Sequence, residues 1–169
     1  MTRVDQGRSN RRGMAVAIAA LGLLATSLVA AAQDQSAATV KDVILARKTL
    51  MNSINDGMDR IGEMTALQTF DPRKAGRHAA DIAAMLTAFP HLFPPGSNQW
   101  KEDGDFDPAT DTIASPDIWT SFADFYRRAT AAAQTASELS RANREDEVRR
   151  LHRALWVACD TCHALYIKE

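Results

Sequence analysis

Cysteine is scarce in this chain, because Cys159 and Cys162 are the only two in 169 residues. A scaffold built on several disulfides is therefore excluded. Aromatic residues make up only 7% of the chain, strand-forming residues are not enriched, and alanine is abundant. Because alanine is the strongest helix former, this composition predicts an all-α protein. The length suits one domain with a single core.

Excess charge is absent as well, since 20 lysines and arginines face 21 aspartates and glutamates. The sequence shows no basic patch or stripe of the kind that binds nucleic acid, so we expect no nucleic-acid partner. No cluster of lysine and arginine marks an amphipathic face either. We therefore expect no binding to an anionic membrane surface.

Residues 1–32 have the pattern of a cleaved secretory signal peptide. Four arginines precede an uncharged apolar run at 14–29, and residues 30–32 are small alanines of the kind that signal peptidase reads. The alternative is a retained membrane anchor, because the run is nearly long enough to span a hydrocarbon core of about 30 Å. The alanines and the polar QDQS that follows favour cleavage after Ala32. We therefore predict a mildly acidic periplasmic domain over residues 33–169, with no membrane insertion after cleavage.

Four amphipathic helices are predicted in that domain. Apolar residues spaced three and four apart run from Val40 to about residue 68. Asp71 and Pro72 begin a second helix that reaches about Ala88. A proline-rich connection follows, and SPD at 115–117 begins a third helix that ends between residues 139 and 142. A fourth begins near residues 144–146. Two short links and one long link favour an antiparallel four-helix bundle.

The inward faces of these helices follow from the same spacing. We expect Val40, Val43, Ile44, Met51, Ile54, Met58 and Ile61 to lie inward in the first helix, and Ala80, Ile82, Met85 and Leu86 in the second. In the third we expect Ile118, Trp119, Phe122, Phe125, Tyr126 and Ala129, and in the fourth Val148, Leu151, Leu155, Trp156, Cys159, Cys162 and Tyr166.

The two cysteines lie in the stretch WVACDTCHALYIKE at the end of the fourth helix. A disulfide between them would close a very small loop and add little stability. A redox dithiol prefers the start of a helix that follows a strand. Zinc needs four ligands, and only three candidates are local. The remaining interpretation is C-x-x-C-H as a signal for c-type haem attachment. Cys159 and Cys162, one helical turn apart, would bind one haem covalently, and His163 would be the proximal iron ligand.

Together with this motif, the stretches ARKTLM, FPHLFPPGS, SPDIW and ACDTCHALY make the predicted domain resemble the class II c-type cytochromes, the cytochrome c′ family. The resemblance implies that Arg47 approaches a haem propionate. It also places Met51, one turn later, at the sixth side of the iron, with Met58 as the rival candidate. The sequence RKTLM at residues 47–51 is more similar to the low-spin branch of this family, in which a methionine at this position ligates the iron. Ile167 departs from the family, which often has arginine or lysine there.

The expected function is electron transfer with redox partner proteins, by a periplasmic carrier whose iron lies between His163 and Met51. The alternative is a five-coordinate iron that binds nitric oxide or carbon monoxide, as a scavenger or sensor. No hydrolytic residue set or phosphate-binding loop is present, so we expect no enzyme beyond what the haem itself does. Relatives often pair through their first two helices, which leaves a homodimer among the partners considered.

Overall fold

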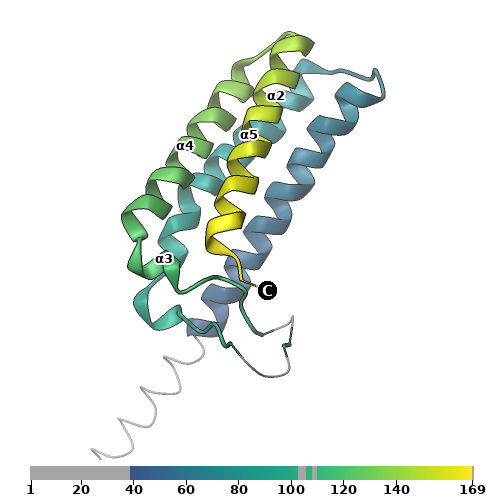
Figure 1. Ribbon diagram of the computed structural model, residues 1–169. Coiled ribbons are helices and arrows are strands. Elements are labelled where there is room, and N and C mark those ends of the chain that lie inside the picture. Colours follow the sequence, from purple (N-terminus) through teal and green to yellow (C-terminus); the bar gives the residue numbers. More distant parts are fainter. Residues whose placement is uncertain (1–38, 103–105, 108–109, 169) are drawn as a thin grey trace, which may run out of the picture. The chain divides into compact units, whose positions relative to one another are not determined.

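The computed structural model describes residues 39–102, 106–107 and 110–168. Its long helices span residues 39–66, α2 Pro72–Ala88, α4 Phe122–Arg141 and α5 Glu145–Tyr166. Figure 1 shows these helices side by side as an antiparallel four-helix bundle. The predicted fold class is therefore confirmed, and the described residues contain no strand. The predicted signal peptide and its cleavage site lie outside the described residues.

The second helix has the predicted bounds because its start is encoded locally. The side chain of Asp71 accepts hydrogen bonds from the backbone amides of Arg73 and Lys74, at 2.9 and 3.1 Å. Pro72 occupies the first helical position, where its missing amide hydrogen costs nothing. The helix before it, 39–66, is followed by a turn at Gln68, whose φ of 56° lies in the left-handed region.

The predicted third helix is two helices in the structure. A short α3, Asp117–Thr120, is separated from α4 by Ser121, whose φ of −122° and ψ of 34° are not helical. Ser115 nevertheless supports the start of α3, because its hydroxyl accepts from the amide of Asp117 at 3.1 Å. The bend at Ser121 occurs between Ile118 and Phe125, and both of these side chains are buried.

The long connection between α2 and α3 contains two short 3-10 helices, η1 Phe89–Leu92 and η2 Pro95–Ser97. Its last part is fastened to the end of α5 by backbone hydrogen bonds. The amide of Ser115 donates to the carbonyl of Tyr166, and that of Lys168 to the carbonyl of Ile113, both at 2.9 Å. These bonds close one end of the bundle.

Helices α2 and α4 approach closely because small residues face each other. A Cβ added to Gly76 would lie 2.9 Å from the carbonyl oxygen of Ser140. Buried alanines continue this contact along both helices, at positions 75 and 79 in α2 and 132, 133 and 136 in α4. Ala80, which was predicted to point inward, is exposed because Ala79 takes the inward position.

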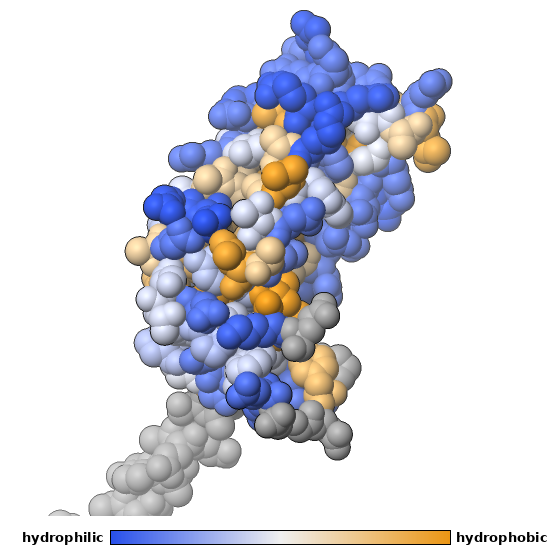
Figure 2. Space-filling model, viewed as in Figure 1, coloured by the Kyte–Doolittle hydropathy of each residue, from blue (hydrophilic) through white to orange (hydrophobic). Residues whose placement is uncertain are grey.

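Some large side chains predicted to be buried are partly exposed. Phe122, Tyr126 and Trp156 retain 38%, 42% and 42% of their accessible surface. In Figure 2, hydrophobic atoms gather along the middle of the face that carries α5, and hydrophilic atoms dominate the upper end of the molecule. Within the described residues, no helix is both long enough and apolar enough to cross a membrane.

Candidate functional site

A cavity of about 610 Å³ lies between the first half of helix 39–66, the start of α4 and the end of α5. All five site residues predicted from the sequence line it: Arg47, Met51, Cys159, Cys162 and His163. Its volume falls within the range of about 300–1,000 Å³ that is typical of pockets for cofactor-sized ligands. Residues more than 100 positions apart in the sequence are thus brought to one space.

The remaining wall of the cavity is largely apolar. Ile54 and Met58 come from helix 39–66, Leu86 from α2, and Phe125 and Ala132 from α4. The connection before α3 adds further side chains at positions 106 and 112–114. A flat apolar ring system placed here would contact hydrophobic side chains on several sides. The lining of the cavity therefore suits a porphyrin better than a polar ligand.

Both cysteines are free thiols on the wall of this cavity, and both are half-buried. Burial raises the pKa of Cys159 to about 11, and burial also raises the pKa of Cys162. A redox dithiol needs a lowered pKa, so this environment does not support the redox alternative. Nowhere in the described parts of the chain do three metal-binding side chains come together, so the zinc alternative gains no support either.

Arg47 is a buried cation in the cavity wall, with 4% of its surface exposed. Its Nε donates to the carbonyl of Leu92 at 2.7 Å, and its Nη2 donates to the carbonyl and hydroxyl oxygens of Ser97. The guanidinium lies 4.2 Å from the ring centre of Phe93 and 5.5 Å from that of Trp119. These four partners were missed by the sequence analysis, although three of them belong to FPHLFPPGS.

The Nη1 group of Arg47 is buried and has no hydrogen-bond partner in the structure. Burial also lowers the pKa of Arg47 to about 10, because no carboxylate compensates the buried charge. An unpaired buried donor is costly, and a carboxylate at this point would satisfy both the donor and the charge. The buried guanidinium of Arg47 therefore fits an anionic ligand in this cavity. A haem propionate is a carboxylate and could accept the hydrogen bond from Nη1.

Two methionines of helix 39–66 line the cavity. Met51 is half-buried and packs against the main core, whereas Met58 is 2% exposed and lies inside that core. They are two helical turns apart, about 10 Å along the axis, so one iron cannot meet both. Met51 lies one turn from Arg47, as the sequence analysis expected. Its role as an iron ligand remains a prediction.

Comparison with known families places the chain in a family of haem proteins. The family model described as Cytochrome C′ matches residues 42–166, most of the chain. The chain belongs to the cytochrome c′ family. Members of this family are periplasmic and carry a covalently attached c-type haem with its iron, which confirms the predicted cofactor. The individual roles of the five site residues and the low-spin branch remain predictions.

Solved cytochrome c′ structures share the fold. The protein from Shewanella frigidimarina is 24% identical with a TM-score of 0.64, over 77% of this chain and 97% of that one. The protein from Rhodopseudomonas palustris is 25% identical with a TM-score of 0.63, over 76% and 97%. A third, described by a ligand-controlled dimer dissociation, is 19% identical with a TM-score of 0.66, over 77% and 97%. A comparison with curated protein sequences gave no match.

One charged group in this cytochrome c′ was missed by the sequence analysis. Asp124 of α4 accepts hydrogen bonds from Arg128 and from the hydroxyl of Tyr166, at 2.6 and 2.7 Å. These bonds lower the pKa of Asp124, with the bond from Arg128 contributing most. Arg128 and Tyr166 line the cavity. Asp124 and Tyr166 are 42 residues apart, so no local pattern could have paired them.

Proposed function

We propose that this cytochrome c′ binds nitric oxide or carbon monoxide at a haem iron held by His163, and acts as a periplasmic scavenger or sensor. The observation that carries the proposal is the apolar cavity that has Cys159, Cys162 and His163 on one side and Met51 on another. The similarity to cytochrome c′ structures favours this function over electron transfer, which was the first expectation. No catalytic turnover is proposed.

Five side chains would hold the haem. Cys159 and Cys162 would form the two thioether bonds, His163 would be the protein ligand of the iron, and Nη1 of Arg47 would pair with a propionate. The bound haem supplies an iron that can take a diatomic gas or change between the ferrous and ferric states. The protein contributes the covalent anchor, the charge that fixes the propionate, and the exclusion of water.

Met51 controls access to the iron in this proposal. Met51 lines the same cavity as the apolar side chains of Ile54, Met58 and Leu86. An apolar wall disfavours the entry of a charged ligand. A side chain that blocks the sixth position without binding admits a small neutral gas and excludes larger or charged ligands. High-spin members of the cytochrome c′ family hold a blocking side chain of this kind at the sixth side of the iron, whereas the sequence RKTLM is more similar to the low-spin branch.

Electron transfer is the second candidate, and Met51 is the observation in its favour. If its sulfur ligates the iron, two axial ligands limit rearrangement between redox states, and thioether coordination stabilises the ferrous state. Redox partner proteins would then dock on this chain. The mildly acidic domain left after loss of the leader would suit a partner with a basic patch.

Optical spectra of the haem-loaded protein separate the two candidates. We expect high-spin ferric bands and ready carbon monoxide uptake by the ferrous form. Met51→Ala should then speed carbon monoxide binding about tenfold or more, because the blocking side chain is gone, without changing the spin state. Met58→Ala is the matched control, and should change gas binding much less.

The opposite result supports electron transfer. Low-spin bands with a methionine-to-iron charge-transfer band in the red region, lost in Met51→Ala, would refute five-coordinate gas binding. Loss of that band in Met58→Ala instead would show that the ligand assignment is wrong. Absence of covalently bound haem after denaturation would refute the attachment to Cys159 and Cys162.

Two further expectations are proposals of the same kind. We propose that the leader is cleaved after Ala32 and that residues 33–169 work in the periplasm, where the family is found. We also propose a homodimer as one state of the protein. The support is that one similar cytochrome c′ undergoes ligand-controlled dimer dissociation.

A further inference from the structure

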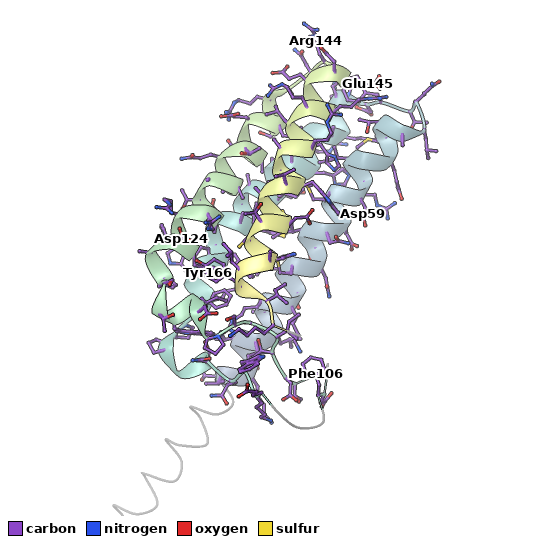
Figure 3. The ribbon with its side chains drawn as sticks, viewed as in Figure 1. Asp59, Phe106, Asp124, Arg144, Glu145 and Tyr166 are labelled. Carbon is purple, nitrogen blue, oxygen red and sulfur yellow. The ribbon has the colours of Figure 1, made fainter. Side chains whose placement is uncertain are left out.

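Asp124, Arg128 and Tyr166 form a charged group that the five proposed haem contacts do not include. Tyr166 is 6% exposed, and its ring packs edge-on against that of Phe125 at 5.3 Å between centres. Its hydroxyl reaches across from α5 to the carboxylate on α4, as Figure 3 shows for Asp124 and Tyr166. The carboxylate is thereby held by both helices, and it holds Arg128 in turn.

Two members of this group, the cation Arg128 and Tyr166, are part of the cavity wall, whereas Asp124 is not. Burial raises the pKa of the Cys162 thiol, and the positive charge of Arg128 partly offsets that rise. The two side chains are therefore near enough to interact electrostatically. Tyr166 follows His163 by one helical turn, so the two share a face of α5. Arg128 therefore shares the cavity wall with the residues proposed to hold the haem, and its charge acts on one of them.

No other arginine or lysine approaches the cavity from this side in the described residues. Arg47 and Lys48 line it from helix 39–66. Ile167, at the position after Tyr166, is uncharged, and the ammonium group of Lys168 is 3.5 Å from the carboxylate of Asp117. Arg128 is therefore the cation that α4 supplies next to α5.

We propose that Arg128, oriented by Asp124 and Tyr166, raises the reduction potential of the haem iron. The proposal rests on the proposed attachment of haem to Cys159 and Cys162. When one electron from an external one-electron donor converts ferric to ferrous iron, the site loses one positive charge. A fixed cation nearby destabilises the ferric state more than the ferrous state, so it favours reduction. Asp124 is the positioning residue, and its negative charge opposes the effect from farther away.

Charge variants of the haem-loaded protein test this proposal through midpoint potentials, measured by spectroelectrochemical titration. Arg128→Met should lower the potential, with the ferrous-to-ferric ratio at a fixed poise falling about three- to tenfold, or about 30–60 mV. Asp124→Asn keeps an oxygen that can accept the hydrogen bond from Arg128, so the guanidinium stays in place, and the potential should rise because the opposing negative charge is removed. General loosening of the cavity would move both variants in the same direction.

Arg127→Met is the matched control. Arg127 also bonds to Asp124 and carries the same charge, but its side chain is 75% exposed and does not line the cavity. We expect a shift well below that of Arg128→Met, since solvent screens an exposed charge. Equal shifts for the two arginines, or a lower potential in Asp124→Asn, would overturn the proposal.

Covalent haem content distinguishes this failure from failure of the proposed function. A wild-type protein with bound haem and a histidine-ligated spectrum, but with charge-insensitive potentials, would overturn only the role of Arg128. A wild-type protein without covalent haem would overturn both proposals.

Discussion

At the scale of single residues, Arg47 joins segments that are 45 and 50 positions away in the chain, through Leu92 and Ser97. Arg47→Lys keeps a charge but loses the planar fork that reaches both partners. We expect it to lower the free energy of unfolding by about 2 kcal/mol, as lost hydrogen bonds to a buried charged group do. Urea unfolding followed by circular dichroism measures this. The control Arg60→Lys, at a position 67% exposed on the same helix, should change little; equal losses would contradict the prediction.

The predictability of the site also depends on single residues. Cys159, Cys162 and His163 could be predicted because C-x-x-C-H is a local pattern with a chemical reason. Arg47 and Met51 depended on the resemblance to a family. Ser97 was not predicted because it meets Arg47 only through the tertiary fold, 50 residues away. The pairing of Asp124 with Arg128 has the helical i,i+4 spacing and could have been found in the sequence, but its bond to Tyr166, 42 residues away, could not.

At the scale of elements, the end of helix 39–66 offers a test of backbone conformation. Gln68 has a φ of 56°, where a side chain is strained and glycine is not. The amide of Thr69 donates to the carbonyl of Met64 at 3.1 Å across this turn. Gln68→Gly should therefore raise the free energy of unfolding by about 0.5–1 kcal/mol. Thermal unfolding measures it, and Gln68→Ala, which keeps a β-carbon, should give no gain. A gain of the same size in both variants would argue against relief of strain.

Element boundaries were predictable where capping residues mark them. Asp71 and Pro72 fixed the start of α2. Helix α5 begins at Glu145, within the predicted start at 144–146, without a side-chain cap but with three acidic residues in its first turn. The break at Ser121 was not predictable, because SPDIW already marks a helix start and the next residues continue the helical spacing. The structure bends there between two buried side chains, and that choice depends on the rest of the core.

At the scale of the whole molecule, stability should depend on pH differently with and without haem. Burial raises the pKa of Cys159 to about 11, so the folded chain keeps a proton that the unfolded chain releases near pH 9. In protein produced without haem, this stability is complete below pH 9 and is lost as the pH rises to 11. We expect a loss of about 1–2 kcal/mol, measured by urea unfolding at each pH, with the thiol's partial exposure taken into account.

Covalent haem removes this thiol, so the haem-loaded protein should not show that component of the alkaline loss. Cys159→Ala without haem is the control, and it should lose less stability than the unmodified chain because only the weaker contributions of Cys162 and Tyr166 remain. An identical alkaline loss with and without haem would contradict covalent attachment at Cys159.

The contact between Gly76 and Ser140 brings the backbones of α2 and α4 close together at the end of α4 away from the cavity. Ala129, in the wall of the cavity, lies about 16 Å farther along the same helix at the usual rise of 1.5 Å per residue. A side chain at position 76 would clash with the backbone carbonyl of Ser140, so α2 and α4 would have to move apart there. The close approach of α2 and α4 at the end of the bundle away from the cavity therefore depends on the absence of a single methyl group.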